Sequence, residues 1–439
     1  MTSSGCLEEK KLVDCVEYLG RGQSPSYFDG ESGVFAINQK CIRNGAVDVS
    51  HARAHHPNIG IRVQSALQEG DICVNSTGTG TIGRVGLWIA EGLDPQNKYF
   101  VDSHVTIVRP HKAEISSKYL AALLESHPIQ VALETYCFSG STNQVELNRS
   151  ALCNLTIGLL PKAEQNTIAA ILSTIDKAIA QTEALIAKQQ RIKTGLMQDL
   201  LTRGIDEHGA IRSEATHAFK DSPLGRIPVE WEEKRLAQVF AIKPKNGIYK
   251  PAHEIGSGCL LVGQTSFTEE NTIDYSLSRR CAINGRELET YGLCEKDLLI
   301  SRVFATVEGV GRAIYVSDLP EEAVYESNML RLRIDEQIVL PKLVFYWLQS
   351  FPIRSRIMAS VNASNQTSIN QQVLNALPIV VARRNEQEKV VLILDQEEAS
   401  LAKTKDLLNK LRKQKNGLMQ DLLTGKVRVN ELLKSSPHG

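Results

Sequence analysis

The sequence predicts an α+β protein: two β-rich domains separated by a pair of long antiparallel helices that form a coiled-coil spacer, arranged as a pseudo-twofold tandem repeat. Three observations predict this fold: a duplicated segment, a long apolar stripe at helical spacing in each copy, and short β-rich runs ahead of each stripe. The 439 residues are enough for two or three domains, because a single core rarely grows beyond about 250–300 residues.

The duplication is the strongest of these observations. The sequence GLMQDLLT occupies residues 195–202 and recurs unchanged at 417–424, 222 positions later. The same offset aligns further identities without a gap: Asn143-Gln144 with Asn365-Gln366, Asn148 with Asn370, Glu164-Gln165 with Glu386-Gln387, and Ile171-Leu172 with Ile393-Leu394. A match of this extent identifies two tandem copies of one unit.

The β-rich domains are assigned to residues 1–155 and 230–377. Both contain short runs of β-branched and aromatic residues, at Val34–Ile37, Ile72–Val74, His104–Val108, Leu260–Val262, Leu298–Ile300 and Met329–Leu332. A weaker repeat at an offset near 224–226 relates the domains, pairing Asp71-Ile72 with Asp297-Leu298 and Ser103–Arg109 with Ser327–Arg333, and approximately Gly83-Arg84 with Gly311-Arg312. The domains therefore share a skeleton while their loops differ.

A spacer helix is predicted at the end of each copy, the central one over residues 156–203 and the distal one over 378–429. Apolar residues recur there every three to four positions: Ile168, Ile171, Leu172, Ile175, Ile179, Leu185, Ile186, Ile192 and Leu196, then Val390, Ile393, Leu394, Leu401, Leu407, Leu408, Leu411 and Leu418. About 38 helical residues at about 1.5 Å each would span roughly 57 Å. Because the copies are joined through a whole domain, we expect the stripes to pack antiparallel. Asn385 followed by Glu388 fits an N-terminal capping pattern for the distal helix.

Two segments remain outside these elements. Residues 204–229 are rich in glycine and proline, which is typical of a linker. Residues 430–439 follow the distal helix and form a C-terminal tail.

Composition excludes several classes of protein. No apolar run approaches the roughly 18–20 residues that cross a bilayer, and the N-terminus MTSSGCLEEKKL lacks the basic segment and apolar core of a signal peptide. A cytoplasmic location, away from membranes, is therefore expected. The 9 cysteines form no CxxC pair and no histidine cluster has zinc-finger spacing, so no metal site is expected. The formal net charge of zero neither favours nor excludes binding to nucleic acid.

The catalytic motifs that the chain could contain are incomplete or absent. Gly78-Thr79-Gly80-Thr81-Ile82-Gly83 spells GxGxxG, but a dinucleotide site needs a helix next, and Arg84–Ile89 has the pattern of a strand. We therefore expect a hairpin or a substrate-facing loop. There is no Pro-Pro or Pro-Asp dipeptide, as amino-methyltransferases and many nucleases require, and no HExxH or GxSxG. The chain is expected to have no catalytic centre.

Several motifs of this duplicated chain carry a resemblance to a known family. They are Leu-Pro-x-x-Glu-Gln at 160–165, the GLMQDLLT pair, Gly-Lys-Val-Arg-Val at 425–429, Leu-Gly-Arg-Ile-Pro-Val-Glu-Trp at 224–231 and Ser-Gly-Ser-Thr-Asn-Gln at 139–144. Over nearly its whole length the chain resembles the specificity (S) subunits of Type I restriction-modification systems. One departure is Ala382-Arg383 in the second copy, where the first copy has Leu160-Pro161.

The resemblance implies a function and a set of partners. Two target-recognition domains would each read half of a bipartite, asymmetric site on double-stranded DNA, with the helices as spacer. Two methyltransferase (modification) subunits would bind near the spacer and use S-adenosylmethionine, and restriction/translocase subunits would use ATP and Mg. The chain itself would be non-catalytic and would hold no cofactor.

Base reading requires polar side chains at base edges, and phosphate contacts set the position of the protein. The candidates for DNA binding in the first domain are Gln39, Lys40, Arg43, Asn44, Thr79, Thr81, Arg84, Ser141, Thr142 and Asn143. Those in the second are Gln264, Arg279, Arg280, Arg302, Thr306, Arg312, Ser364, Asn365 and Gln366. For each residue, a solvated loop position is the alternative. Asn143-Gln144 and Asn365-Gln366 are identical between copies, which favours a shared structural or phosphate-binding role.

Three other functions stay open at this point. The chain could serve another restriction class, Type IIB-like, with a fused methyltransferase-nuclease partner. It could be a helical scaffold that binds proteins and not DNA. A stand-alone enzyme is disfavoured by the missing motifs.

Overall fold

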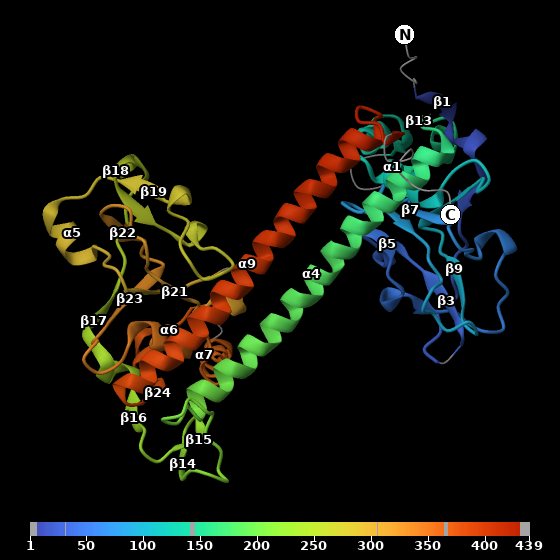
Figure 1. Cartoon of the computed structure of the whole chain (residues 1–439). Helices are drawn as coiled ribbons and strands as arrows, with labels where there is room; N and C mark the ends of the chain where they lie inside the picture. Colours follow the sequence, from blue (N-terminus) through green and yellow to red (C-terminus); the bar gives the residue numbers. More distant parts are fainter. Residues whose placement is uncertain (1–6, 31, 141–144, 305, 364–367, 431–439) are drawn as a thin grey trace. The chain divides into compact units, whose positions relative to one another are not determined.

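A computed structural model describes residues 7–30, 32–140, 145–304, 306–363 and 368–430 (Figure 1). The chain divides into two compact units, the first comprising 1–184 with 405–439 and the second 185–404. Each unit contains one β-rich domain and about half of each long helix. The predicted α+β class and the two-domain repeat are confirmed.

The first unit is built on a six-stranded sheet with the order β2-β10-β7-β8-β5-β4 and a three-stranded sheet with the order β6-β3-β9. The strands of the larger sheet are β2 Val16–Arg21, β10 Val105–Pro110, β7 Ile72–Asn75, β8 Val85–Leu87, β5 Gly45–Val47 and β4 Ile42–Arg43. The smaller sheet contains β6 Arg53–Ala54, β3 Val34–Ile37 and β9 Lys98–Val101. The remaining elements are α1 Ser117–Glu125, α2 His127–Ala132, the π-helix Leu133–Cys137, β11 Phe138–Ser139, β12 Glu146–Leu147 and α3 Arg149–Cys153.

The second unit repeats this plan with fewer strands. Its sheets have the orders β17-β23-β20-β21 and β19-β18-β22. Their strands are β17 Phe240–Asn246, β23 Met329–Ile334, β20 Leu298–Ser301, β21 Ala313–Tyr315, β19 Arg279–Cys281, β18 Ile255–Val262 and β22 Ala323–Tyr325. The helices are α5 Gly285–Tyr291, α6 Pro341–Gln349, α7 Phe351–Ala363 and α8 Gln371–Ala376. All six strand runs predicted from the sequence lie within or overlap observed strands.

Each β-rich domain begins and ends in two adjacent antiparallel strands. In the first unit β1 Glu8–Lys11 pairs with β13 Thr156–Leu159, and in the second β16 Glu232–Arg235 pairs with β24 Pro378–Val381. A backbone hydrogen bond continues each pair, from Leu12 N to Leu155 O at 2.9 Å and from Leu236 N to Leu377 O at 2.8 Å. The two ends of each domain are therefore held together.

The long helices are α4 Lys162–Thr202 and α9 Arg384–Leu423, the green and red ribbons of Figure 1. In the first unit Arg412 pairs with Glu183 at 2.7 Å and Lys415 with Asp176 at 3.0 Å. Residue numbers rise along one helix as they fall along the other. In the second unit Gln189 donates to Ser400 at 3.1 Å and Lys193 pairs with Glu398 at 2.6 Å, again in opposite order. The prediction of an antiparallel pair is confirmed.

Both helices begin later than the sequence suggested. Thr156–Leu159 is strand β13, and α4 starts only at Lys162, because the residue before Pro161 is restricted to extended backbone. The helix α9 starts at Arg384. Asn385 therefore lies inside the first turn and is not its N-cap, so that capping prediction was wrong.

The segment assigned as linker contains structure of its own. Phe219–Ser222 (β14) and Gly225–Pro228 (β15) form an antiparallel hairpin. Lys220 Nζ donates to the backbone oxygen of Trp231 at 2.5 Å, which fastens this hairpin to the start of the second domain. Proline and glycine content had indicated only turns.

The Glu-Gln sequence at the start of each long helix makes the same contacts twice. Gln165 accepts from Ser116 N at 2.9 Å and donates to Leu160 O at 2.8 Å. Gln387 accepts from Leu340 N at 2.8 Å and donates to Ala382 O at 2.9 Å. The glutamine thus joins the helix to the strand before it and to the start of α1 or α6. This contact accounts physically for the repeated motif.

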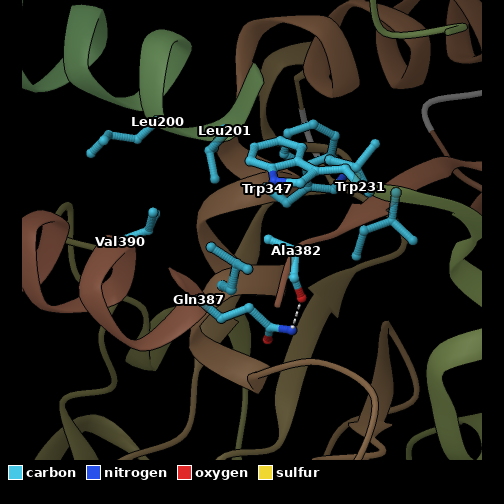
Figure 2. Close-up of a pocket in the computed structure, with 10 residues that line it drawn as sticks. Leu200, Leu201, Trp231, Trp347, Ala382, Gln387 and Val390 are labelled. Atoms are coloured by element: carbon cyan, nitrogen blue, oxygen red, sulfur yellow. Dashed lines mark hydrogen bonds between the residues drawn. The ribbon is translucent and has the colours of Figure 1, made fainter. Parts of the chain in front are cut away.

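A small apolar pocket lies beside this junction in the second unit, as Figure 2 shows. Leu200 and Leu201 from the end of α4 and the rings of Trp231 and Trp347 line it, together with Val390 of α9. Leu201, Trp231, Trp347 and Val390 are all buried in one hydrophobic cluster. The pocket belongs to the packing that seats the two helix ends on the second domain. Within the described part of the chain, no helix is long and apolar enough to cross a membrane.

Candidate nucleic-acid interface

The glycine-rich loop of the first unit connects the antiparallel strands β7 and β8. Gly78, Gly80 and Gly83 have φ values of 103°, 74° and 80°, in the left-handed region that favours glycine. A Cβ on Gly78 would lie 2.2 Å from Gln39 Oε1, so a side chain there would displace the end of Gln39. A strand, and not a helix, follows the loop. The expectation of a hairpin in place of a dinucleotide site is confirmed.

The two candidate loops of the first domain lie next to each other. The Thr81 hydroxyl donates to Gln39 Oε1 at 3.2 Å, which joins the short 3-10 helix Gln39–Cys41 to the glycine-rich loop. Arg43, Asn44 and Arg84 line one hollow together with Gln130. Asn44 has a φ of 50°, a turn conformation that asparagine tolerates. Basic and amide side chains from two sequence-distant loops are therefore gathered at one surface.

A broader groove adjoins this hollow, and Gln130 lines both. One wall is the glycine-rich loop with Thr79, and another is formed by α2 and the strands β11 and β12. His104, Thr77 and Glu146 also line the groove. The groove and hollow together offer hydroxyl, imidazole, amide, guanidinium and carboxylate groups. Such a set can donate to and accept from base edges and can bind phosphates.

Three groove residues, Thr77, His104 and Glu146, were missed from the sequence. The His104 Nδ1 lies 2.8 Å from the Thr77 hydroxyl, and Glu146 pairs with Arg21 at 3.0 Å. The alignment of Ser103–Arg109 with Ser327–Arg333 was a signal that could have found His104. That alignment contains one position, His104 against Asn328, where two different polar residues occupy a shared skeleton.

Among the candidates of the second domain, Gln264 has a place equivalent to that of Gln39. Gln264 begins a 3-10 helix like that of Gln39, and its amide donates to Val303 O at 2.5 Å. Arg302 directly follows strand β20, and Thr306 is exposed in the next loop. The Arg302 Nε is buried with no hydrogen-bond partner within the described residues. The contact of these residues with DNA stays a prediction.

Three arginines of the second domain are already engaged within it. Arg279 pairs with Glu326, and Arg280 pairs with Glu321 at 2.5 Å. Arg312 Nε donates to Asn271 Oδ1 at 2.6 Å, and burial lowers the pKa of its guanidinium. These groups would need to exchange partners in order to bind DNA. Ser141, Thr142, Asn143, Ser364, Asn365 and Gln366 lie outside the described residues.

An aspartate–arginine ion pair lies beneath the larger sheet of each domain. It gives a physical reason why Asp71 and Arg109 recur as Asp297 and Arg333 in the sequence repeat. Arg109 donates to both oxygens of Asp71 at 2.7 Å, and Arg333 donates to those of Asp297 at 2.8 and 2.7 Å. Both aspartates are buried. These hydrogen bonds raise the pKa of Arg109 and that of Arg333. The pairs anchor the strands that carry the groove.

Three or more His, Cys, Asp or Glu side chains do not gather as a metal-binding group anywhere in the described ranges. The candidate interface is built from loop and turn residues on a repeated scaffold. It has the features of a recognition surface.

A family model and known proteins match this chain. The model of the Type I restriction modification DNA specificity domain matches residues 55–190 and 228–413, one stretch in each copy. The chain is 27% identical over 335 residues to a putative type I restriction enzyme MjaX specificity subunit of Methanocaldococcus jannaschii, covering 74% of this chain and 72% of that protein. It is 26% identical over 280 residues to the type I restriction enzyme MjaVIII specificity subunit of the same organism, covering 64% of each.

The fold also matches a solved structure. The crystal structure of the type I restriction-modification system S subunit from M. genitalium aligns with a TM-score of 0.57 at 15% identity. The alignment covers 94% of this chain and 95% of that one. At this identity the likeness establishes the fold.

Proposed function

The chain belongs to the Type I restriction modification DNA specificity family and is a DNA-recognition subunit of such a system, and we propose that it reads a bipartite, asymmetric site with one half-site for each β-rich domain. The observation that carries this proposal is the repeated strand scaffold, which presents different loop side chains in the two copies. Identical readers related by twofold symmetry would favour a palindrome. Two unlike readers favour two unlike half-sequences.

The helix pair is proposed as the spacer between the half-sites. A helix of 41 residues, the length of α4, extends roughly 60 Å, and half-sites one turn of DNA apart are separated by about 34 Å. Ion pairs between the helices occur in both units, at Lys193–Glu398 and Lys415–Asp176. Two helices joined by ion pairs resist bending better than a flexible linker does, so the pair would keep the two half-sites at one fixed separation.

We assign the methylation and restriction reactions to partner subunits. Two methyltransferase subunits would bind near the helices and methylate an adenine in each half-site with S-adenosylmethionine, and restriction/translocase subunits would use ATP and Mg. The chain would be non-catalytic, hold no cofactor and act in the cytoplasm. The family assignment and the specificity subunits it resembles support this division of labour.

Methylome sequencing tests the proposal. The chain is co-expressed with its methyltransferase partner in a host without other adenine methylation. We expect methyladenine in a motif of two different specified sequences separated by unspecified bases. A single continuous motif, a palindrome, or no chain-dependent methylation would contradict the proposal. A gel shift of the complex on the deduced site should weaken steeply with salt.

A further inference from the structure

A repeated backbone frame surrounds the turn at the edge of the groove. In the first domain Ser76 N donates to His104 O at 2.8 Å, and Leu147 N donates to Ser76 O at 2.8 Å. Thr77 and Glu146 form an isolated antiparallel bridge beside these bonds. Three chain segments distant in sequence therefore meet at this point.

The second domain has the same frame with other residues. Arg302 N donates to Asn328 O at 2.9 Å, and Ile369 N donates to Arg302 O at 2.8 Å. Val303 and Ser368 form the equivalent bridge. The offsets of 226, 224 and 222 positions are those of the sequence repeat. The two frames are thus copies of one ancestral turn.

The backbone contacts that support the frame are alike in the two copies. Asn75 N donates to Arg84 O and Gly83 N to Asn75 O, both at 2.9 Å. The matching bonds join Ser301 N to Arg312 O at 2.9 Å and Gly311 N to Ser301 O at 2.7 Å. The buried aspartate–arginine pairs under the sheets are also the same. These shared contacts place the aligned residues of the two domains at the same points of the frame.

The side chains at the bridge and the neighbouring turn differ between the copies. Thr77 is replaced by Val303, His104 by Asn328, and Glu146 by Ser368. His104, Asn328 and Glu146 are exposed, and the other three residues are half-buried. In the first domain all three side chains line the groove. These side chains therefore differ between the copies, while the backbone hydrogen bonds of the frame and the aspartate–arginine pair beneath the sheet are kept.

We propose that Thr77/Val303, His104/Asn328 and Glu146/Ser368 are specificity-determining positions, at which each domain reads its own half-site. The inference rests on the proposed function and assigns residues to it. The Thr77 hydroxyl orients the His104 ring through Nδ1 at 2.8 Å, which leaves Nε2 for a base edge. An asparagine amide, as at Asn328, can bind adenine through two hydrogen bonds. Valine offers only an apolar contact, of the kind that a thymine methyl accepts.

Reciprocal exchange within the full chain tests these assignments. His104→Asn gives the first domain the side chain of the second, and Asn328→His does the reverse. Each variant is assembled with the methyltransferase partner and measured on probes substituted at every base of both half-sites. We expect His104→Asn to change the discrimination at one or two adjacent base pairs of one half-site by about tenfold. The other half-site should keep the wild-type preference, and Asn328→His should show the opposite pattern.

The control is His111→Asn, the same substitution at a partly exposed histidine of the first unit that does not line the groove. It should leave discrimination unchanged at every base. Thr77→Val provides a second variant, since it removes the hydroxyl that orients His104 while keeping the shape of the side chain. It should weaken the same base preference as His104→Asn.

The outcomes distinguish a failure of the inference from a failure of the proposed function. A uniform loss of binding with unchanged discrimination, or no change at all, would overturn the inference. Changes in both half-sites from one variant would overturn it as well. If the wild-type complex recognises no bipartite site, the proposed function fails first. If the wild-type site is bipartite and the variants keep it, only the inference fails.

Discussion

Glu164, in the first turn of α4, accepts a 2.8 Å hydrogen bond at Oε2 from Nε of Arg428, which follows the end of α9. In the second unit Glu386, in the first turn of α9, accepts from Arg212, which follows the end of α4, with Arg212 Nη2 3.2 Å from Oε2. Trp231 Nε1 and Ile205 N also donate to Glu386, at 3.2 and 3.0 Å. Each glutamate thus binds the segment that follows the other helix.

Replacing either glutamate should destabilise its own unit. Glu386→Gln removes the buried carboxylate partner of Arg212, whose side chain is 9% exposed, and leaves it the more exposed Glu230, 3.2 Å from its Nε. Loss of one member of a buried pair costs about 3–5 kcal/mol. Glu164→Gln should cost less, about 1–3 kcal/mol, because the Arg428 side chain is 25% exposed. Urea unfolding measures both changes in the free energy of unfolding. The exposed Glu114→Gln is the control, and a value for Glu386→Gln as small as the control's would refute this account.

The same contact predicts a response to acid. The hydrogen bond from Arg428 lowers the pKa of Glu164 below its ordinary value of 4.5. A carboxylate with a lowered folded pKa contributes stability that is fully present above the unfolded pKa and lost as the pH falls through the folded value. The stability difference between wild type and Glu164→Gln should therefore be constant from pH 7 to about 5 and shrink below about 4.5. Unfolding curves over this range test it, and a difference that grows in acid would contradict it.

The glycine-rich loop allows a matched comparison of two glycines. Both Gly78 and Gly80 have positive φ, but a Cβ would meet Gln39 Oε1 at 2.2 Å on Gly78 and nothing within 4 Å on Gly80. Gly80→Ala should cost only the conformational strain, about 1 kcal/mol. Gly78→Ala should cost more and displace Gln39, which also weakens binding to the specific site. Thermal unfolding and gel shifts measure the two effects. Equal behaviour of the variants would mean that the loop does not need this close approach.

Arg84 and Arg302 are expected to act differently on DNA. Arg84 is exposed beside Arg43 in the hollow, which suits a phosphate contact, so Arg84→Ala should weaken all probe sequences alike and reduce the salt slope by about 1. Arg302→Ala should lower affinity by about 1–3 kcal/mol at most and relax one base position. Binding titrations at several salt concentrations separate the two. The control is Arg226→Ala in the β14–β15 hairpin, and unchanged binding by Arg302→Ala across the probe set would remove that residue from the interface.

Periodicity and repetition predicted the fold well because they depend on local pattern. Val34–Ile37 coincides with β3, and the apolar stripes mark both long helices. The start of α4 was misplaced because the restriction that Pro161 places on the residue before it was not applied, and because the pairing of Thr156–Leu159 with β1, residues 8–11, is not visible in local pattern. The role of Glu164 and Glu386 was hidden for the same reason. Their arginine partners lie 264 and 174 positions away.

The candidate interface was predictable only in part. Polar loop residues such as Gln39 and Thr81 were found by type, and the structure brings these two into contact. His104 was missed because it lies within a segment, His104–Val108, that had been assigned to a strand. The repeat alignment sets it against Asn328, and the backbone frames of the two domains show that these two positions are equivalent. Residue type suggests what can bind DNA, whereas the frame shows which positions are equivalent.

The strand pairs β1–β13 and β16–β24 have a consequence for how the two domains can change over evolutionary time. Each pair fixes the start of a domain against its finish, so insertions or deletions in the intervening loops are absorbed before they reach α4 or α9. New loop sequences can therefore be tried without altering the start of either helix. The loops of each β-rich domain can therefore vary in sequence and length, whereas α4 and α9 keep their lengths.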